Sequence, residues 1–184
     1  MRYPETHKAE TRKRIVTTAA KAFRKHGING IGLVPLMKNT GLTHGGFYAH
    51  FKSKDALIGE AIDAAFDQTI NRLRRAAEAA PEKTRRRAII DEYISEAHRD
   101  DPSVGCAVAA LGTETARLKP TVREHFDKNL ESVLKLMMDD GKESASRADA
   151  IRTLATAVGA IVLARTVRSK ELSKEILETA RQMP

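Results

Sequence analysis

Apolar residues recur every three or four positions along nearly the whole chain, and this spacing predicts a protein built of α-helices. In the first such stretch, residues 7–25, Ile15, Ala19 and Phe23 form one apolar stripe, while most of the basic residues lie off it. Alternation of β-branched and polar residues, the pattern of a strand, is rare. We therefore expect an all-α fold.

The same spacing predicts about nine helices, and glycine, proline and hydroxyl residues mark their ends. Gly27 is the expected C′ residue of the first helix, because glycine readily takes the left-handed conformation that ends a helix. Thr43 and Ser53 are expected N-caps, Pro120 suits a first turn, and Gly141 is expected to stop the helix that Pro120 opens. The predicted helices span residues 7–25, 33–39, 43–50, 54–79, 82–99, 104–118, 120 to Gly141, 146–167 and 173–182.

Charge divides the chain into two parts. Residues 1–54 contain eleven Lys and Arg and two Glu, a net charge of +9, whereas residues 55–184 carry a net charge of −1. A basic segment beside a near-neutral body indicates an anionic partner, either nucleic acid or an acidic membrane surface. A solvated helix that happens to be basic is the simpler alternative. We expect an N-terminal domain over residues 1–54 and a second domain over residues 55–184.

Composition excludes several classes of protein. With 41% hydrophobic and 30% charged residues in 184, the chain can bury a core and is not a disordered polyelectrolyte. Its single cysteine excludes a disulfide framework within the chain and a cysteine-based zinc site, and it fits a reducing compartment. No apolar run approaches the roughly 20 residues of a membrane span, and the polar N-terminus does not resemble a signal peptide. We expect a cytoplasmic protein without metal or other cofactor.

The most informative segment is residues 32–51, GLVPLMKNTGLTHGGFYAHF, where two short predicted helices flank a turn. Such a pair forms a helix-turn-helix, whose second helix can enter the major groove of DNA. The inserted face must be slim, and the adjacent Gly45 and Gly46 make it so. Each glycine in a helix costs about 1 kcal/mol relative to alanine. Close approach to DNA explains that cost; an ordinary loop is the alternative. The motif is expected to be held on the first and fourth helices by Leu36, Leu42, Phe47 and Phe51.

The segment GLTHGGFYAHFKSKDAL, residues 41–57, strongly resembles the helix-turn-helix signature of the TetR/AcrR family of bacterial transcriptional repressors. The resemblance extends upstream through RIVTTAAKAFRKHGINGIGL and, more loosely, to GCAVAALGTETAR and ARTVRSKELSKEILETAR. It implies a ligand-responsive DNA-binding transcriptional regulator. In this interpretation the chain is a homodimeric repressor that a small-molecule effector releases from a palindromic operator in double-stranded DNA.

The resemblance also assigns DNA contacts residue by residue. It places phosphate contacts at Tyr48 and Lys54, with His50 and Lys52 as further candidates, and tyrosine and lysine side chains are good phosphate donors. A packing role for Tyr48 and a solvent-exposed Lys52 are the alternatives. The residues expected to meet base edges are Thr43, His44, Gly46 and Phe47.

The chain departs from the family pattern in the predicted helix 33–39. The family commonly has threonine or serine as the cap where this chain has Gly32, and a polar or basic side chain where this chain has Val34 and Pro35. We therefore expect no strong base contact from this helix. Arg12 and Lys13 of the basic first helix are expected to contact the DNA backbone instead.

For the second domain, the resemblance implies a small-molecule pocket within helices four to seven. The candidates include Tyr93, His98 and Glu114, which are able to orient a polar group among apolar walls. For each of them an ordinary core or surface role is the alternative. The full set of candidate ligand-binding residues is Phe66, Ile70, Tyr93, His98, Cys106, Leu111, Glu114 and Phe126.

Cys106 supports an alternative function, a thiol-based repressor that senses oxidants or electrophiles. A cysteine at a helix N-terminus favours the reactive thiolate. A buried structural cysteine is the competing interpretation of the same residue.

The last two predicted helices, residues 146–167 and 173–182, are expected to form a four-helix interface with a second copy. The first of them is apolar nearly all round, and small residues (Ala155, Ala157, Gly159 and Ala160) permit close helix approach. A helix buried within one chain is the alternative. A dimer also suits two DNA half-sites about 34–36 Å apart.

An enzyme and a membrane-surface protein are two other classes of function. The chain has no metal-ligand spacing, no phosphate-binding glycine loop and no nucleophile elbow, and its six histidines include no HxxxH pair, so we do not expect an enzyme. A basic protein that binds acidic lipid through its first helix is the third possibility, and liposome flotation would distinguish it. We expect no membrane partner.

Overall fold

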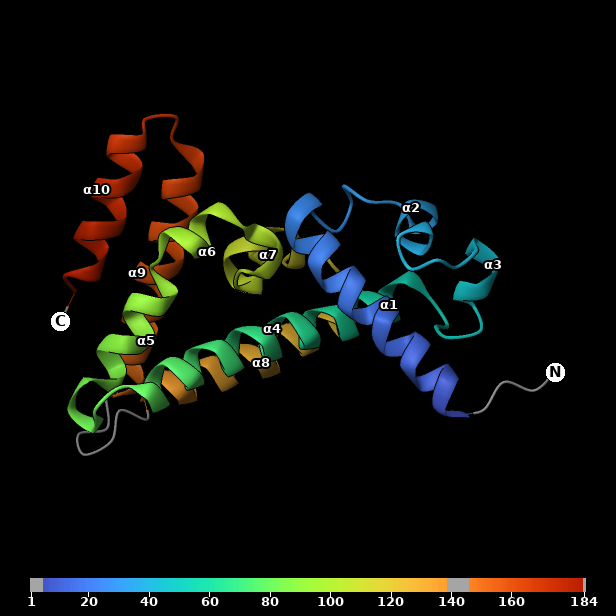
Figure 1. Ribbon diagram of the computed structural model, residues 1–184, viewed down its shortest axis with the longest axis horizontal. Helices are drawn as coiled ribbons and strands as arrows, with labels where there is room; N and C mark the ends of the chain where they lie inside the picture. The colour runs from blue at the N-terminus through green and yellow to red at the C-terminus, as the bar shows by residue number, and fades with distance from the viewer. Residues whose placement is uncertain (1–4, 139–145, 184) are drawn as a thin grey trace.

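The computed structural model describes residues 5–138 and 146–183, and in these ranges the chain forms ten α-helices, two short 3₁₀-helices and no strand (Figure 1). The predicted all-α fold is confirmed. The helices are α1 (Glu5–His26), α2 (Leu33–Lys38), α3 (His44–Phe47), α4 (Lys54–Ala79), η1 (Glu82–Thr84), α5 (Arg85–Tyr93), α6 (Glu96–Asp100), η2 (Pro102–Val104), α7 (Ala107–Thr115), α8 (Pro120–Met138), α9 (Arg147–Thr166) and α10 (Lys170–Arg181).

Local chemistry sets the helix ends in the N-terminal part as the sequence predicted. Gly27 has φ +80° directly after α1. The hydroxyl oxygens of Thr43 and Ser53 accept hydrogen bonds from the amides of Gly46 (3.3 Å) and Ala56 (3.1 Å), which caps α3 and α4. The expected stop at Gly141 lies outside the described residues.

Four predicted helices are divided in the structure or have a boundary that lies three residues from the predicted one. The helix expected over residues 82–99 is divided, because α5 ends at Tyr93 and the Ser95 hydroxyl starts α6 by accepting from the His98 amide at 3.2 Å. The next helix begins only at Ala107, after the 3₁₀ turn η2. The second helix of the motif is shorter than expected, since α3 ends at Phe47. Finally, α10 begins three residues early because Ser169 caps it.

Helix α4 is the central helix of the molecule, against which other parts of the chain pack (Figure 1). Its first turns pack against α1, and its length packs against α8 on one side and α5 on another. Buried side chains on several of its faces, among them Leu57, Ile62, Phe66 and Leu73, make a single continuous core. The N-terminal helices and the second half of the chain therefore share one long helix.

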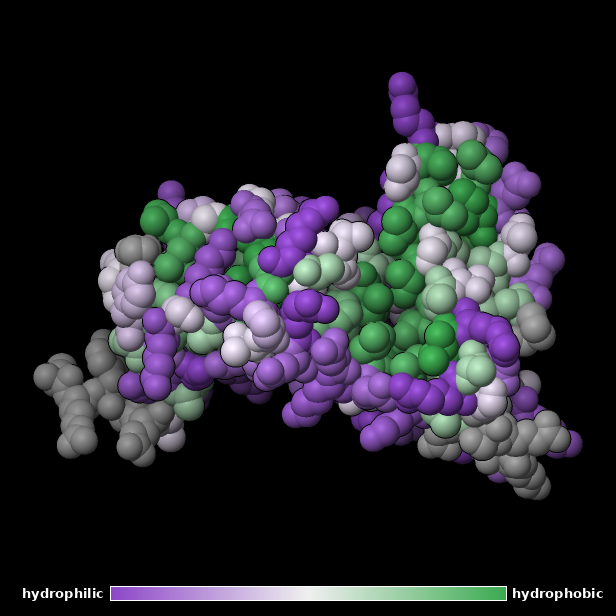
Figure 2. Space-filling view, turned by 180° about the vertical axis from the view of Figure 1, so that it is seen from behind, coloured by the Kyte–Doolittle hydropathy of each residue, from purple (hydrophilic) through white to green (hydrophobic). Residues whose placement is uncertain are grey.

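Helices α9 and α10 form an antiparallel arm at the opposite end from α2 and α3 (Figure 1). One face of α9, with Ala157 and Ala160, is buried within the chain. Its other face exposes large apolar side chains, including Leu163 at 56%. Figure 2 shows apolar residues gathered over this arm. Among the described helices, none is both long and apolar enough to cross a membrane.

Candidate DNA-binding surface and effector core

A buried aromatic cluster fixes the helix-turn-helix on the rest of the protein. Phe47 is 0% exposed, and its ring stacks on that of Phe51 at a centroid distance of 5.4 Å. Leu36 from α2 is buried in the same core. These contacts hold α3 in place and leave its other face at the surface. The three buried residues were predicted to hold the motif, whereas Leu42, the fourth, is only partly buried.

The burial of Phe47 corrects one predicted DNA contact. A side chain without exposed surface cannot meet a base edge, so the assignment of Phe47 to base contacts is wrong in this structure. Its neighbour Tyr48 is 62% exposed and touches the Phe47 ring edge-on at 5.2 Å. The structure therefore does not support the alternative, in which Tyr48 is a half-buried packing residue.

The exposed face of α3 is made of small groups. Thr43 and Gly45 are exposed, Gly46 is half-buried and His44 begins the helix. A Cβ atom added at Gly45 would meet nothing within 4 Å, and one added at Gly46 would have Thr43 Oγ1 as its nearest neighbour, at 3.6 Å. The fold therefore has room for a side chain at both positions and does not itself require glycine there.

The basic residues predicted to bind phosphates differ in their contacts within the protein. Lys52 is exposed, whereas the Lys54 ammonium donates to the Ile28 carbonyl at 3.2 Å. His50 borders a groove of about 380 Å³ together with Lys8 and Arg12, and the His50 Nδ1 atom is buried without a hydrogen-bond partner among the described residues. Burial, and then the two cations, lower the pKa of His50.

Arg12 is engaged within the protein. Its guanidinium donates to the His50 carbonyl and to the Glu60 carboxylate, and it lies 4.2 Å from the centroid of the Phe51 ring. Arg12 braces α1 against α4, and its side chain keeps 39% of its surface exposed, so the predicted contact with the DNA backbone stays a prediction. Lys13 is exposed and stays a candidate. In α2, Gly32 is the N-cap without a side-chain bond and Val34 is 62% exposed.

The candidate ligand-binding residues lie mostly in the closed core. The exceptions are Glu114 and Phe126, which are half-buried, and Phe126 meets the Phe66 ring edge-on at 5.2 Å. The buried candidates, all 8% exposed or less, are Phe66, Ile70, Tyr93, His98, Cys106 and Leu111. In this structure these residues pack as core, so a ligand among them requires the core to open.

Glu114 has a different partner from the one expected. Its carboxylate accepts a hydrogen bond from the Ile28 amide at 2.9 Å, just beyond α1. The carboxylate is bound to the N-terminal part of the chain, and its predicted role in orienting a ligand stays a prediction.

His98 is locked as a neutral ring. Its Nδ1 lies 2.7 Å from the Tyr93 carbonyl, and its Nε2 accepts from the Cys106 amide at 2.9 Å, so the hydrogen-bond network assigns the proton to Nδ1. Burial, assisted by the charges of Arg72, Arg165 and Arg24, lowers the pKa of His98 to about 4. A protonated ring would lose its bond from the Cys106 amide.

This lowered pKa predicts a loss of stability in acid. Between pH 6.5 and about 4 the unfolded His98 binds a proton that the folded one does not, so stability falls as the pH falls through this interval, by about 3 kcal/mol in all. Urea unfolding at pH 7 and pH 4.5 measures the difference. We expect His98→Gln, in which an uncharged amide replaces the ring, to remove most of it and His26→Gln, at an exposed site, to leave it unchanged. An unaltered pH dependence in His98→Gln would show that other groups carry it.

Cys106 is the N-cap of α7, as its position suggested, and is fully buried. Its Sγ accepts from the Val108 amide at 3.4 Å. Burial and the neighbouring Cys106 raise the pKa of the Tyr93 hydroxyl well above its ordinary value. The structure thus gives Cys106 a packing and capping role. No cluster of three potential metal ligands occurs among the described residues.

Three arginines that sequence reasoning did not select converge on the chain between His98 and Gly105. Arg24 of α1 donates to the Gly105 carbonyl at 2.8 Å, and Arg72 of α4 donates to the Val104 carbonyl at 2.9 Å. Arg165 of α9 donates to the carbonyls of residues 98 and 99. Arg24 is 3% exposed, and burial lowers its pKa to about 10. No local signal distinguishes it from the exposed lysines on either side.

Comparisons with known proteins agree with this geometry. Residues 15–61 match the family model of bacterial regulatory proteins, tetR family. The HTH-type transcriptional repressor NemR of Escherichia coli K12 is 25% identical over 141 residues, which is 73% of this chain and 70% of NemR. The crystal structure of reduced E. coli NemR superposes with a TM-score of 0.78 at 21% identity, covering 95% of this chain and 96% of that one.

Two further solved structures share the fold. A TetR transcriptional regulator from Chloroflexus aurantiacus J-10-FL superposes with a TM-score of 0.80 at 23% identity, covering 96% of this chain and 94% of that one. AibR, solved in complex with isovaleryl coenzyme A and operator DNA, gives a TM-score of 0.66 at 16% identity, with coverages of 93% and 96%.

A helix-turn-helix with an exposed second helix, carried by a larger helical domain, defines a transcriptional regulator. Residues 15–61 belong to the TetR family of bacterial regulatory proteins, and the chain as a whole has the fold of solved regulators of that family.

Proposed function

We propose that the protein is a homodimeric repressor that binds a palindromic operator and is released from it by a small-molecule effector. Residues 1–54 bind DNA, and residues 55–184 bind the effector and the second copy. The observation that carries the proposal is the slim outward face of α3, where glycines stand at positions that have room for larger side chains. Close contact with DNA is the reason we give for them.

In this proposal α3 reads the major groove through Thr43, His44 and the backbone at Gly46. Tyr48, Lys52 and Lys54 bind phosphates, and His50 with Lys8 adds another anion site. The N-terminus of the long helix α4, capped by Ser53, supports a phosphate there as well, because helix N-termini attract anions.

The phosphate contacts predict a change in salt dependence. Each neutralised phosphate contributes about 0.9 to the slope of log K against log salt. We expect Lys54→Met to weaken operator binding and to lower this slope by about 0.9, and Tyr48→Phe to weaken binding while leaving the slope nearly unchanged, since the hydroxyl is uncharged. Fluorescence anisotropy over a salt series measures both.

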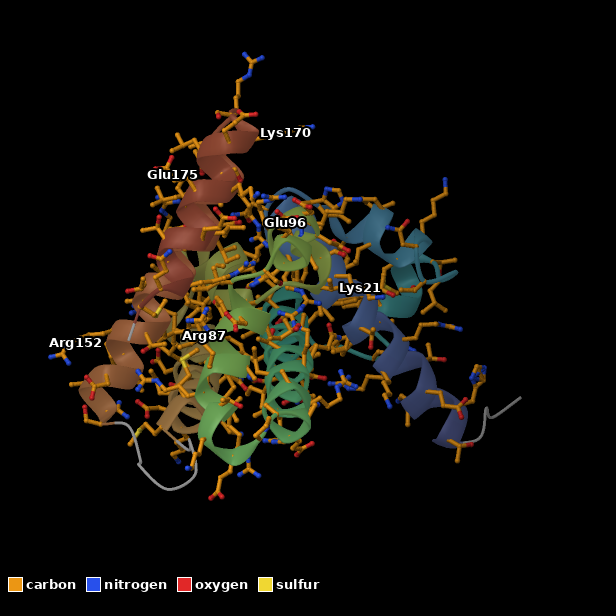
Figure 3. All side chains as sticks on the ribbon, turned by 60° about the vertical axis from the view of Figure 1, so that its left-hand side comes forward. Lys21, Arg87, Glu96, Arg152, Lys170 and Glu175 are labelled. Atoms are coloured by element: carbon orange, nitrogen blue, oxygen red, sulfur yellow. The ribbon has the colours of Figure 1, made fainter. Side chains whose placement is uncertain are left out.

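The matched control for this series is Lys21→Met. Lys21 is exposed on α1, where Figure 3 labels it, and it is not among the residues proposed to contact DNA. Its loss is expected to leave the slope within error. A slope that falls for Lys21→Met and not for Lys54→Met would place the phosphate contacts on a different surface.

The α9–α10 arm supports the homodimer. An apolar groove of about 690 Å³ runs along it, and its lining includes Gly159, Leu163 and Leu172. A Cβ added at Gly159 would meet nothing within 4 Å, so a second helix can approach closely there. Figure 1 shows this arm and the helix-turn-helix helices α2 and α3 at opposite ends of the molecule, so one protomer can use the two faces together.

A shared fold and a buried apolar core support the effector response. AibR was solved with an acyl coenzyme A and operator DNA, and its fold is shared with this chain. The buried set of candidate residues offers apolar walls once the core opens, and Tyr93 supplies a buried hydroxyl beside Cys106. The thiol-sensor alternative has less support, because Cys106 is fully buried and reactive cysteines are usually accessible.

A further inference from the structure

A groove of about 720 Å³ lies between α6, the η2 turn and the chain that joins α9 to α10, and we call it the α6–α10 groove. Its volume is typical of sites that bind small molecules. Figure 3 labels two of its lining residues, Glu96 of α6 and Lys170 of α10. Residues 55–184 carry a net charge of −1, yet cations outnumber anions in this lining. The cations are Arg99, Arg165, Arg168, Lys170 and Lys174, and the anions are Glu96 and Asp100.

Three of these cations have no carboxylate partner among the described residues. Arg168 and Lys170 are exposed and form no ion pair there. Arg165 is half-buried and donates through Nε and Nη2 to the carbonyls of residues 99 and 98, which leaves its Nη1 group without a hydrogen bond within the described part of the chain. The other two cations are paired, Arg99 with Asp100 at 2.7 Å and Lys174 with Glu178 at 3.6 Å.

Hydrogen bonds between three helices build the base of the groove. The Ser173 hydroxyl of α10, which is 6% exposed, accepts from Arg99 Nη1 of α6 at 3.3 Å and donates to the Ala164 carbonyl of α9 at 2.7 Å. Arg165 joins α9 to α6 through its bonds to residues 98 and 99. The fold therefore sets the positions of Arg99 and Arg165.

The charge of Arg165 is only partly compensated within the protein. Burial lowers the pKa of its guanidinium, because a cation that is partly removed from water loses hydration. Two backbone carbonyls offset some of this loss. An anion beside the remaining Nη1 group would offset more of it, since desolvated charges are stabilised by a charged partner with good hydrogen-bond geometry.

The N-terminus of α10 does not by itself account for an anion site. Ser169 caps this helix, because its hydroxyl accepts from the Leu172 amide at 3.0 Å and donates to the Glu171 carboxylate at 2.9 Å. Glu171 lies in the first turn, so the helix end already has a negative charge beside it. A further anion would be held by the side chains of the groove.

The α6–α10 groove also lies apart from the face that we propose meets the second copy. Successive residues of an α-helix are about 100° apart around its axis, so Arg165 lies about 200° round α9 from Leu163. Lys174 likewise lies about 200° round α10 from Leu172. Both leucines line the apolar groove of the arm. A second copy that covers them leaves Arg165 and Lys174 accessible.

The chemistry of the free cations suits phosphate. Guanidinium groups donate paired hydrogen bonds to phosphate oxygens, and a lysine ammonium adds a compact charge beside them. The Glu96 carboxylate accepts hydrogen bonds, so it suits the hydroxyl or amino groups of an organic molecule. We propose that the α6–α10 groove binds an organic phosphate of nucleotide size with at least two phosphate groups, which Arg165, Arg168 and Lys170 hold. This inference goes beyond the proposed function, because the site lies outside both the core around Tyr93 and the helix-turn-helix.

Isothermal titration calorimetry of the intact protein with adenosine triphosphate, at physiological salt and without DNA, tests the proposal. We expect saturable binding of the nucleotide and none of adenosine at the same concentrations, because the phosphates supply the contacts. The double variant Arg168→Met/Lys170→Met is expected to bind at least about tenfold more weakly, since two charge-assisted contacts are lost. Both residues are exposed, so its circular dichroism spectrum is expected to match that of the wild type.

The matched control is Lys128→Met/Lys135→Met, which removes the same charge from exposed sites on α8. It is expected to leave the affinity for the nucleotide unchanged. An equal loss of affinity in both double variants would show that net charge alone attracts the nucleotide, and the proposal would be overturned. Adenosine that binds as tightly as the triphosphate, or a wild-type protein that binds neither, would overturn it as well.

Hydrogen exchange followed by mass spectrometry locates the bound nucleotide. Protection is expected over residues 96–102 and 164–174, which line the groove. Protection confined to residues 1–54, which carry a net charge of +9, would place the nucleotide on the proposed DNA-binding surface and contradict the inference. Operator binding tests the proposed function separately, so either proposal can fail without the other.

Discussion

Replacing Gly45 with leucine is expected to leave the protein folded and to lower its affinity for its operator about a thousandfold, close to the non-specific level. The site is exposed, and a Cβ there meets no atom of the protein within 4 Å. Leucine also stabilises a helix by up to about 1 kcal/mol relative to glycine. The loss of affinity would arise because the added side chain holds α3 away from the bases.

Two measurements separate stability from DNA binding in this variant. Thermal unfolding by circular dichroism is expected to show a melting temperature equal to or above that of the wild type. Anisotropy with labelled operator at fixed salt gives the affinity. The control is Ala79→Leu, at an exposed site at the far end of α4, which is expected to bind as the wild type does. Normal operator binding by Gly45→Leu would mean that α3 does not enter the groove.

Leu163→Asp is expected to convert the dimer into a folded monomer and to lower operator affinity at least about a hundredfold. Leu163 is 56% exposed in one chain and lines the apolar groove of the α9–α10 arm. An aspartate there tolerates solvent in the monomer, whereas burial in the interface would desolvate its charge. In a dimer bound at one half-site, the second DNA-binding domain is held near the other half-site at an effective concentration in the millimolar range. A monomer lacks this tethered second domain and therefore binds more weakly.

Size-exclusion chromatography with light scattering measures the mass of this variant, and circular dichroism checks its fold. Val104→Asp is the control, because Val104 is also a partly exposed apolar residue, at 40%, and lies outside the arm. It is expected to remain a dimer. A dimeric Leu163→Asp protein would place the interface between copies elsewhere on the surface.

Much of the fold could be predicted because its determinants are local. The spacing of apolar residues and a serine cap located α4 at residues 54–79, and Gly27 ended α1. The division of the helix predicted over residues 82–99 was missed because Ser95 competes as a cap in the middle of a periodic stretch, and periodicity does not weigh such caps.

The candidate site was harder to predict because its key contacts join distant parts of the chain. The bonds of Arg24 with Gly105 and of Ile28 with Glu114 span 81 and 86 residues, and no local pattern records them. Phe47 was misassigned because a position on a short helix does not say which way packing turns the ring. Apolar spacing likewise predicted a core around Tyr93, but it does not distinguish a filled core from a cavity.

The most direct test of the central claim is selection of DNA by the intact protein. The purified protein is mixed with a random duplex pool at physiological salt, and the retained DNA is sequenced. We expect an inverted repeat whose half-sites are centred one helical turn, about 10 base pairs, or a multiple of it apart. Retained DNA that shows no enriched sequence would contradict the claim that this protein is a dimeric reader of an operator.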